Sequence, residues 1–242
     1  MIAYIRPGRS RRTVMVFGGF HGDEPKSVFV ANCLIELLST SRTRGDATPF
    51  PSPTKGDATF FPSPKRGDAT LDKGRRYTLS PAPAGKATWI IVPLVNPDGF
   101  ALRKRRNARG VDLNRNFPTR NRQPGAPRSR MYGGPSPASE PETRAVMRII
   151  ERYQPDRMVT IHSIGCGRYC NNYDGPARTI AMAMSRRNGY PVTANIGYPT
   201  PGSFGTWAGI ERGISVVTLE LPSAASPQRC WLDNRDALLC LA

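Results

Sequence analysis

The chain contains 242 residues, of which 38% are hydrophobic, and this length is enough for one α/β domain with a substantial core. No apolar run approaches the roughly 20 residues that a membrane-spanning helix requires, and the N-terminus lacks the apolar core and cleavage site of a secretory signal. The five cysteines are odd in number and scattered, which favours free thiols over a disulfide framework. These features predict a cytoplasmic protein without a membrane partner.

The charge balance is strongly basic, with 35 lysine and arginine residues against 18 aspartate and glutamate residues, a net charge of +17. Such a charge suggests nucleic-acid binding. However, the basic residues concentrate in two segments typical of loops, "ALRKRRNARG" and "RNRQPGAPRSR", and the chain has no helix-turn-helix, zinc-finger or RNP pattern. Specific nucleic-acid binding is therefore disfavoured, whereas a basic rim suits a site for a small anionic peptide.

Strand and helix patterns alternate along the chain. Apolar runs rich in β-branched residues predict buried strands at 13–20, 88–95, 157–163 and 214–221. Periodic apolar residues predict helices at 24–40, 139–154 and 174–189. This alternation predicts an α/β fold: a single domain, residues 1–242, with a mixed, largely parallel central sheet flanked by helices on both faces.

The predicted helices carry recognisable end signals. Pro25 is suited to the first turn of the first helix. Ser139 and Glu142 have the spacing of a capping box at the start of the second. Asp174 is suited to cap the start of the third helix, and Gly189 to end it.

Residues 41–76 interrupt the alternation. The segments "RGDATPFPSP", "KGDATFFPSP" and "RGDAT" repeat with an eleven-residue period set by Gly45, Gly56 and Gly67. A right-handed coiled coil can have this period, but prolines at this density exclude a helix. Because the segment is rich in proline, glycine and small polar residues, it cannot bury enough apolar surface to offset the entropy of ordering. We therefore predict a disordered insertion within the domain.

The chain has only two histidines, and both lie at the ends of predicted strands. His21 follows the first strand, and Glu24 opens the first helix three positions later. Gly22 permits a tight turn, so both side chains can point to one place beyond the carboxyl edge of the sheet. His162 ends another buried strand. Two imidazoles and a carboxylate match the three protein ligands of a catalytic zinc site.

From spacing alone, two interpretations of these residues remain open. They form a zinc site, or His21 is a solvated turn residue and His162 a core histidine. A candidate base exists in either case, because Glu220 ends a run of valine, threonine and leucine residues. Burying a carboxylate there is costly without a purpose or a partner, and desolvation would raise its pKa toward the range useful for accepting a proton from water. An edge-exposed glutamate is the alternative.

Six segments together resemble the zinc metallocarboxypeptidase family, and they occur in the order "GGFHGDEP", "VPLVNPDGF", "RNARGVDLNRNFP", "TIHS", "NNYDGPA" and "VTLELP". They cover most of the chain outside the insertion. Within the family, "FHGDEPKS" and "NYDGPA" are most similar to the murein peptide amidases. The resemblance implies a cytoplasmic hydrolase with one zinc ion per chain. Its substrate would be the γ-D-glutamyl–meso-diaminopimelate bond of peptides recycled from the cell wall.

The resemblance also implies roles for individual residues. A planar guanidinium beside a neutral amide donor suits a substrate carboxylate, and an upstream arginine suits a developing oxyanion. For that arginine, the run "RKRR" leaves Arg103 and Arg106 open beside Arg105. The implied zinc ligands are His21, Glu24 and His162; the general base is Glu220; the oxyanion-stabilising residue is Arg105; and the substrate-binding residues are Asn114, Arg115 and Tyr198.

Four other functions compete with the amidase. An aspartoacylase-like zinc deacylase of N-acyl amino acids, or a carboxypeptidase of another specificity, would use the same metal. A binding protein without catalytic activity would be expected to lack Glu220, which is present. A nucleic-acid binder would show salt-sensitive retention on DNA and contain no zinc.

Overall fold

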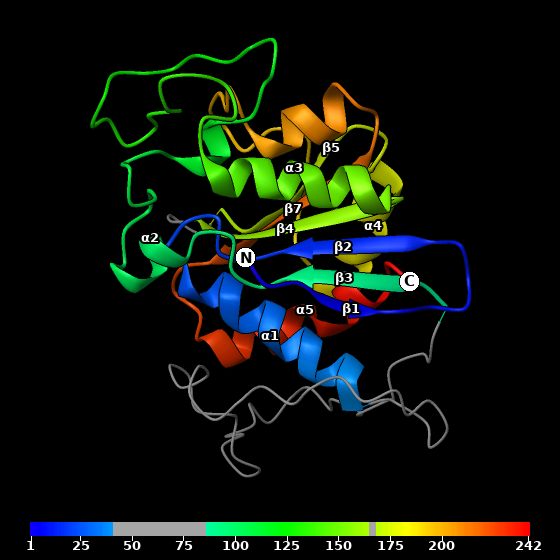
Figure 1. Ribbon diagram of the computed structural model, residues 1–242. Helices are drawn as coiled ribbons and strands as arrows, with labels where there is room; N and C mark the ends of the chain where they lie inside the picture. The colour runs from blue at the N-terminus through cyan, green and yellow to red at the C-terminus, as the bar shows by residue number, and fades with distance from the viewer. Residues whose placement is uncertain (41–85, 165–167) are drawn as a thin grey trace, which may run out of the picture.

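The computed structural model describes residues 1–40, 86–164 and 168–242 (Figure 1). The predicted disordered insertion at 41–76 lies outside these residues. The described chain forms a central sheet with helices on both faces, which confirms the predicted fold class. No helix within it combines the length and apolarity needed to cross a membrane.

The sheet has seven strands in the order β1-β3-β2-β4-β7-β5-β6. The strands β2, β3, β4 and β7 are parallel, whereas β1 and the β5–β6 pair run antiparallel to their neighbours β3 and β7. The four predicted strands are therefore the four central parallel strands. Their bounds and those of the other strands are β1 (Tyr4–Arg6), β2 (Thr13–Phe17), β3 (Thr88–Val92), β4 (Arg157–Ile164), β5 (Cys170–Asp174), β6 (Val192–Thr193) and β7 (Ser215–Pro222).

Helices cover both faces of this sheet, with α3 on one side and α1 and α5 on the other (Figure 1). Two further short helices have 3-10 and π geometry. The helices are α1 (Pro25–Thr40), α2 (Pro97–Ala101), α3 (Pro141–Tyr153), α4 (Arg178–Asn188) and α5 (Pro227–Leu239), with the 3-10 helix η1 (Leu113–Arg115) and the π-helix η2 (Gly205–Ile210).

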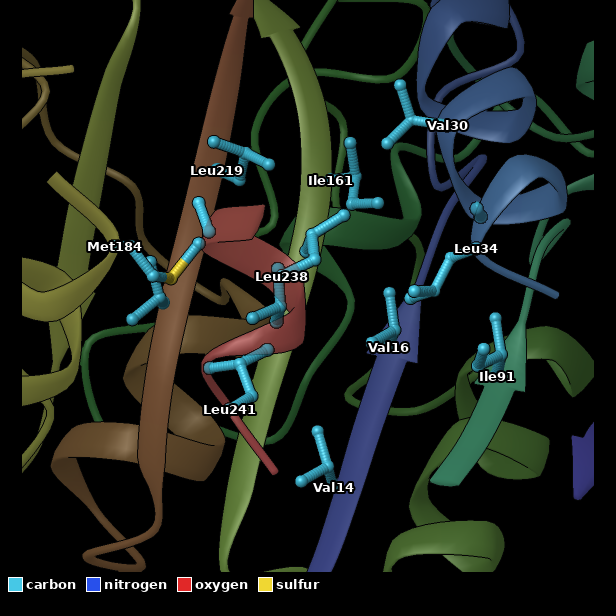
Figure 2. Packing of buried hydrophobic residues seen from close by; sticks show 14 of the residues in the cluster. Val14, Val16, Val30, Leu34, Ile91, Ile161, Met184, Leu219, Leu238 and Leu241 are labelled. Atoms are coloured by element: carbon cyan, nitrogen blue, oxygen red, sulfur yellow. The ribbon is translucent and has the colours of Figure 1, made fainter. Parts of the chain in front are cut away.

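Alternation along the strands divides the core into two clusters. Val14 and Val16 of β2 face α1, α4 and α5, together with Ile91, Ile161 and Leu219 of the neighbouring strands (Figure 2). The intervening residues of β2 face the other side. There Met15 and Phe17 pack with the aromatic residues Phe20, Phe117, Phe204 and Trp207. Phe20 of this aromatic cluster stacks on His162, with the ring centroids 5.8 Å apart, so the cluster packs against the candidate site.

Two predicted helix ends are wrong. Helix α3 has Glu140 at its N-cap with no side-chain cap bond; the Ser139 hydroxyl instead donates to the Glu140 carboxylate, 2.7 Å away, so the capping box does not form. Asp174 does not cap α4, which begins at Arg178 after Ala177. Asp174 instead ends β5, a polar strand that the apolar pattern does not reveal. The predicted end at Gly189 is confirmed, with a left-handed φ of 73°.

Candidate active site

A sharp turn after β2 carries the first two candidate ligands. The Glu24 amide donates to the His21 carbonyl, 3.2 Å away, just before α1 begins. Gly22 is needed here for space, because a Cβ at this position would lie 1.9 Å from the carbonyl carbon of Gly99 in α2. The turn therefore holds both side chains inside the protein, where His21 is 2% exposed and Glu24 is 8% exposed.

His162 in β4 completes a compact cluster. Its Nδ1 lies 3.0 Å from Glu24 Oε2 and 3.2 Å from His21 Nδ1, and His21 Nδ1 lies 2.8 Å from Glu24 Oε1. Ligand atoms about 2.0–2.1 Å from a tetrahedral zinc ion are about 3.3 Å from one another. The donor types and their spacing therefore fit zinc. The structure brings together the three residues that the sequence analysis identifies as candidate zinc ligands.

Asp112, in the loop before η1, orients His21. Its Oδ1 lies 3.0 Å from His21 Nε2, and its Oδ2 accepts from Arg105 Nε at 3.0 Å. Because Nε2 donates to this fully buried carboxylate, the neutral ring keeps its lone pair on Nδ1, the atom that faces Glu24 and His162. The sequence analysis does not identify Asp112, because its partner His21 lies 91 positions away and no local pattern links the two residues.

The protonation states of the three candidate ligands favour binding of a cation. Burial opposes a charge on His21, but the carboxylates of Glu24 and Asp112 outweigh burial and raise the His21 pKa to about 8. Burial also favours the neutral form of Glu24, but His21 and His162 lower the Glu24 pKa well below its usual value. Burial lowers the pKa of His162. Glu24 is therefore ionised at neutral pH, and a bound cation would displace the proton from His21.

Glu220 lies beside this cluster, since β7 pairs with β4 so that Glu220 is opposite His162. Its side chain is only 6% exposed, so the edge-exposed alternative is wrong. Burial, and then the nearby Glu24 carboxylate, raise the Glu220 pKa to about 8. Glu220 and the cluster line one cavity of about 500 Å³.

The other predicted site residues line the same cavity: Arg105, Asn114, Arg115 and Tyr198. Arg105 Nη1 lies 3.5 Å from Glu24 Oε1. Arg103 is instead exposed, and Arg106 donates to the carbonyl of Ser129. Of the three arginines that the sequence leaves open, only Arg105 is in the cavity wall.

Asn114 and Arg115 present donors to this cavity. Asn114 Oδ1 accepts from the Phe204 amide at 2.8 Å, so its Nδ2 group is left to donate. Arg115 is 2% exposed, and no carboxylate forms an ion pair with it within the described ranges; its Nε has no partner there. Tyr198 is 40% exposed at the rim of the cavity.

The sequence model for zinc carboxypeptidases matches residues 84–232. The chain belongs to the zinc carboxypeptidase family. It is therefore a hydrolase of the zinc metallopeptidase type. The matched region includes His162 and Glu220, whereas His21 and Glu24 precede it, so the site of this zinc carboxypeptidase combines residues from inside and outside the matched region.

Two relatives of this zinc carboxypeptidase are murein peptide amidases. It is 28% identical over 241 residues to murein peptide amidase A of Escherichia coli strain K12, which covers 94% of this chain and 78% of that protein. The Vibrio campbellii protein of the same name is 32% identical over 161 residues, 62% of each chain. The crystal structure of murein-tripeptide amidase MpaA from Escherichia coli O157 superimposes with a TM-score of 0.67 and 27% identity, covering 98% of this chain and 84% of that one.

A more distant relative shows the fold alone. Carboxypeptidase A from Helicoverpa armigera has a TM-score of 0.68 at 19% identity, and the match covers 98% of this chain and 63% of that one. The architecture around the cavity is thus that of zinc carboxypeptidases in general.

The contact between Asp112 and His21 leads to a first prediction. Asp112→Asn should lower zinc affinity about 10- to 100-fold, because the neutral amide no longer stabilises the His21 imidazole in the orientation that presents Nδ1. Competition with a zinc chelator of known affinity measures the change. Asp236→Asn, which removes a carboxylate that is 62% exposed on α5, is the matched control. Equal zinc affinity in Asp112→Asn and the wild type would contradict the prediction.

Proposed function

We propose that the protein hydrolyses the γ-D-glutamyl–meso-diaminopimelate bond of murein peptides, with one zinc ion held by His21, Glu24 and His162. Three groups lie together in one cavity, and this observation carries the proposal: the ligand cluster, the carboxylate of Glu220, and the guanidinium of Arg115, whose Nε has no partner among the described residues. The similarity to murein peptide amidases along 94% of the chain supports the choice of substrate.

When bound, zinc would supply a Lewis acid that polarises the amide carbonyl and makes water more acidic. Glu220 accepts the proton of the attacking water, because its carboxylate lines the cavity next to the ligand cluster. Glu220 then donates this proton to the nitrogen of the departing amine. Arg105 donates to the carbonyl oxygen as that atom becomes anionic. The hydrogen bond from Arg105 Nε to Asp112 holds the guanidinium in position for this role.

Substrate binding rests on the other wall of the cavity. Arg115 and the Nδ2 group of Asn114 donate to the carboxylate of the departing diaminopimelate residue. Asn114 is fixed by the Phe204 amide and Arg115 by the Asn114 carbonyl, which accepts from its Nη1 at 2.6 Å. Tyr198, at the rim of the same cavity, contacts the bound substrate. The anionic peptide thus meets cationic donors within a strongly basic protein.

The direct test uses L-Ala-γ-D-Glu-meso-diaminopimelate as the substrate. Mass spectrometry should detect release of free diaminopimelate by protein that holds one zinc ion per chain, and no release of acid from N-acetyl amino acids under the same conditions. If zinc-loaded protein releases no diaminopimelate but deacylates N-acetyl amino acids, the proposal is wrong and a deacylase takes its place.

A further inference from the structure

The segment "VPLVNPDGF" has no role in the reaction described above. Its Asn96 lies between the end of β3 and the start of α2, and it is fully buried. Asn96 lies outside the set of residues that line the cavity, so it acts on the reaction only through other residues. Because a buried amide requires partners for its polar atoms, these partners indicate what Asn96 does.

The side chain of Asn96 forms three hydrogen bonds. Its Oδ1 accepts from the Gly99 amide at 2.9 Å and so caps the first turn of α2. Its Nδ2 donates to the carbonyl of Phe20 at 3.3 Å and to the carbonyl of Arg105 at 3.2 Å. The cap alone does not require asparagine, since aspartate and serine are equally common in this position. The distinctive contribution of asparagine is therefore its pair of N–H donors.

The two carbonyls that accept from Asn96 belong to different parts of the site. Phe20 immediately precedes the candidate ligand His21 in the turn after β2, whereas Arg105 lies in the loop after α2 and stabilises the oxyanion in the proposed reaction. The backbone amide of Asn96 adds a further link, because it donates to the Gly19 carbonyl at 2.9 Å. One buried residue thus joins the turn that carries the ligands to the loop that carries the arginine.

The loop after α2 folds back onto Asn96. The Lys104 amide donates to the Gly99 carbonyl at 2.8 Å, which turns the chain directly after the helix. Gly99 is needed here for space, because a Cβ at this position would lie 2.4 Å from Asn96 Nδ2 and 2.6 Å from the Arg106 carbonyl oxygen. The backbone around Arg105 therefore packs directly on the Asn96 amide.

The other end of Arg105 is also held. Its Nε donates to Asp112 at 3.0 Å, and its Nη1 lies 3.5 Å from Glu24 Oε1. These contacts set the direction of the guanidinium, whereas the bond from Asn96 sets the position of the backbone from which the side chain extends. A donor stabilises an oxyanion only when it lies about 2.7–3.1 Å from the atom that becomes charged. A misplacement of about 1 Å can lower a rate about 100-fold.

We infer that Asn96 is a positioning residue: by donating to the Phe20 and Arg105 carbonyls, it holds Arg105 in a fixed place relative to the metal-ligand turn. This inference rests on the proposed function and extends it to a residue that does not contact the substrate.

Asn96→Asp retains the size of the side chain and the acceptor for the Gly99 amide, but it replaces the two N–H donors by an oxygen that faces two carbonyls. The variant should lower kcat about 10- to 100-fold, because Arg105 acts on the transition state. KM should stay near the wild-type value, since Asn114 and Arg115 bind the substrate elsewhere. Asn96→Ser, which also keeps a helix cap but does not reach the carbonyls, should have the same effect.

Asn234 in α5 provides a matched control for the loss of a buried amide. It is also 0% exposed and lies outside the cavity. Its Nδ2 donates to the Tyr190 hydroxyl at 3.1 Å and the Cys230 carbonyl at 2.8 Å, and its Oδ1 accepts from Asn188 Nδ2 at 2.9 Å. Asn234→Asp should lower the Tm by a similar amount but leave kcat unchanged. An equal loss of kcat in Asn234→Asp would overturn the inference, because reduced stability would then explain both results.

A double-mutant cycle tests whether Asn96 acts through Arg105. Arg105→Gln alone should lower kcat about 100- to 1,000-fold in zinc-loaded protein. Adding Asn96→Asp to this variant should cause little further loss. If Asn96→Asp lowered kcat by the same factor with and without Arg105, the two residues would act independently and the inference would be wrong.

A crystal structure of zinc-loaded Asn96→Ser provides a test that requires no substrate. The Arg105 guanidinium should be displaced from Asp112 and from the cavity wall, with the rest of the fold unchanged. A displaced Arg105 in a protein that does not hydrolyse the tripeptide would support the role of Asn96, and only the proposed function would fail. An Arg105 side chain in its wild-type position would overturn the role of Asn96, whether or not the tripeptide is hydrolysed.

Discussion

Glu220→Gln is expected to lower kcat on the murein tripeptide by about 100- to 10,000-fold, the range for loss of a positioned general base. Glutamine has nearly the same shape as glutamate but cannot take a proton from water. Because Glu220 is not among the cluster of candidate ligands, the variant should still contain one zinc ion per chain. Release of diaminopimelate in a discontinuous assay measures the rate, and elemental analysis of the same sample measures zinc.

Two results would contradict this role of Glu220. A variant with full zinc content and a rate within a few-fold of the wild type would show that another group accepts the proton. A variant that loses zinc would show that Glu220 holds the metal. Glu36→Gln, in the middle of α1 and outside the cavity, provides the matched control for removal of one carboxylate and should be fully active.

Removal of zinc with a chelator should abolish hydrolysis and also destabilise the fold. Without the ion, the buried Glu24, His21 and His162 face one another with only a proton in its place. Zinc present at about 1,000 times its dissociation constant stabilises by about 4 kcal/mol. For a chain of this size that corresponds to a change in Tm of about 10 °C. Scanning calorimetry with and without chelator measures the shift.

A variant that cannot bind zinc supplies the control for chelation. His162→Ala should melt at the same temperature with and without chelator, and adding zinc should leave its Tm unchanged. Re-addition of zinc to the stripped wild type should restore both its Tm and its activity. If stripped wild-type protein, shown by elemental analysis to be free of metal, hydrolysed the tripeptide at the normal rate, the reaction would not depend on the metal.

The sequence predicts those parts of the site whose positions are set by a single turn or strand. His21 and Glu24 share one turn, and the apolar run before His162 places it at the end of a central strand, so the sequence pattern indicates that the three residues meet at one edge of the sheet. The same argument predicts that Glu220 lies near these residues, because the carboxyl ends of parallel strands meet at one edge of the sheet. The four central strands and the α/β class were predictable for this reason.

The parts that the sequence does not predict depend on distant contacts. Asp112 contacts a histidine 91 positions away, and no local pattern links them. The choice of Arg105 among three arginines likewise requires the loop to be folded. Strand β5 has polar residues that no apolar alternation marks, because Asn171 is buried against Asn188, with 3.1 Å between Asn171 Nδ2 and Asn188 Oδ1. Asp174 therefore has the appearance of a helix cap in the sequence but belongs to the cavity.

Helix α1 carries the chain away from the candidate metal ligands, so the chain length can vary beyond this helix without affecting the site. The helix begins at the candidate metal ligands and runs back along the sheet for 16 residues, about 24 Å, toward the edge where β3 starts (Figure 1). Thr88 pairs with Thr13 at that edge, so the described chain stops at Thr40 and resumes at Lys86 on the side of the sheet away from the ligands. For a flexible connection between two such ends, each doubling of length costs only about 0.6 kcal/mol. Evolution can therefore lengthen or shorten the chain there, and an engineer can graft a tag or a second domain there, without moving a ligand.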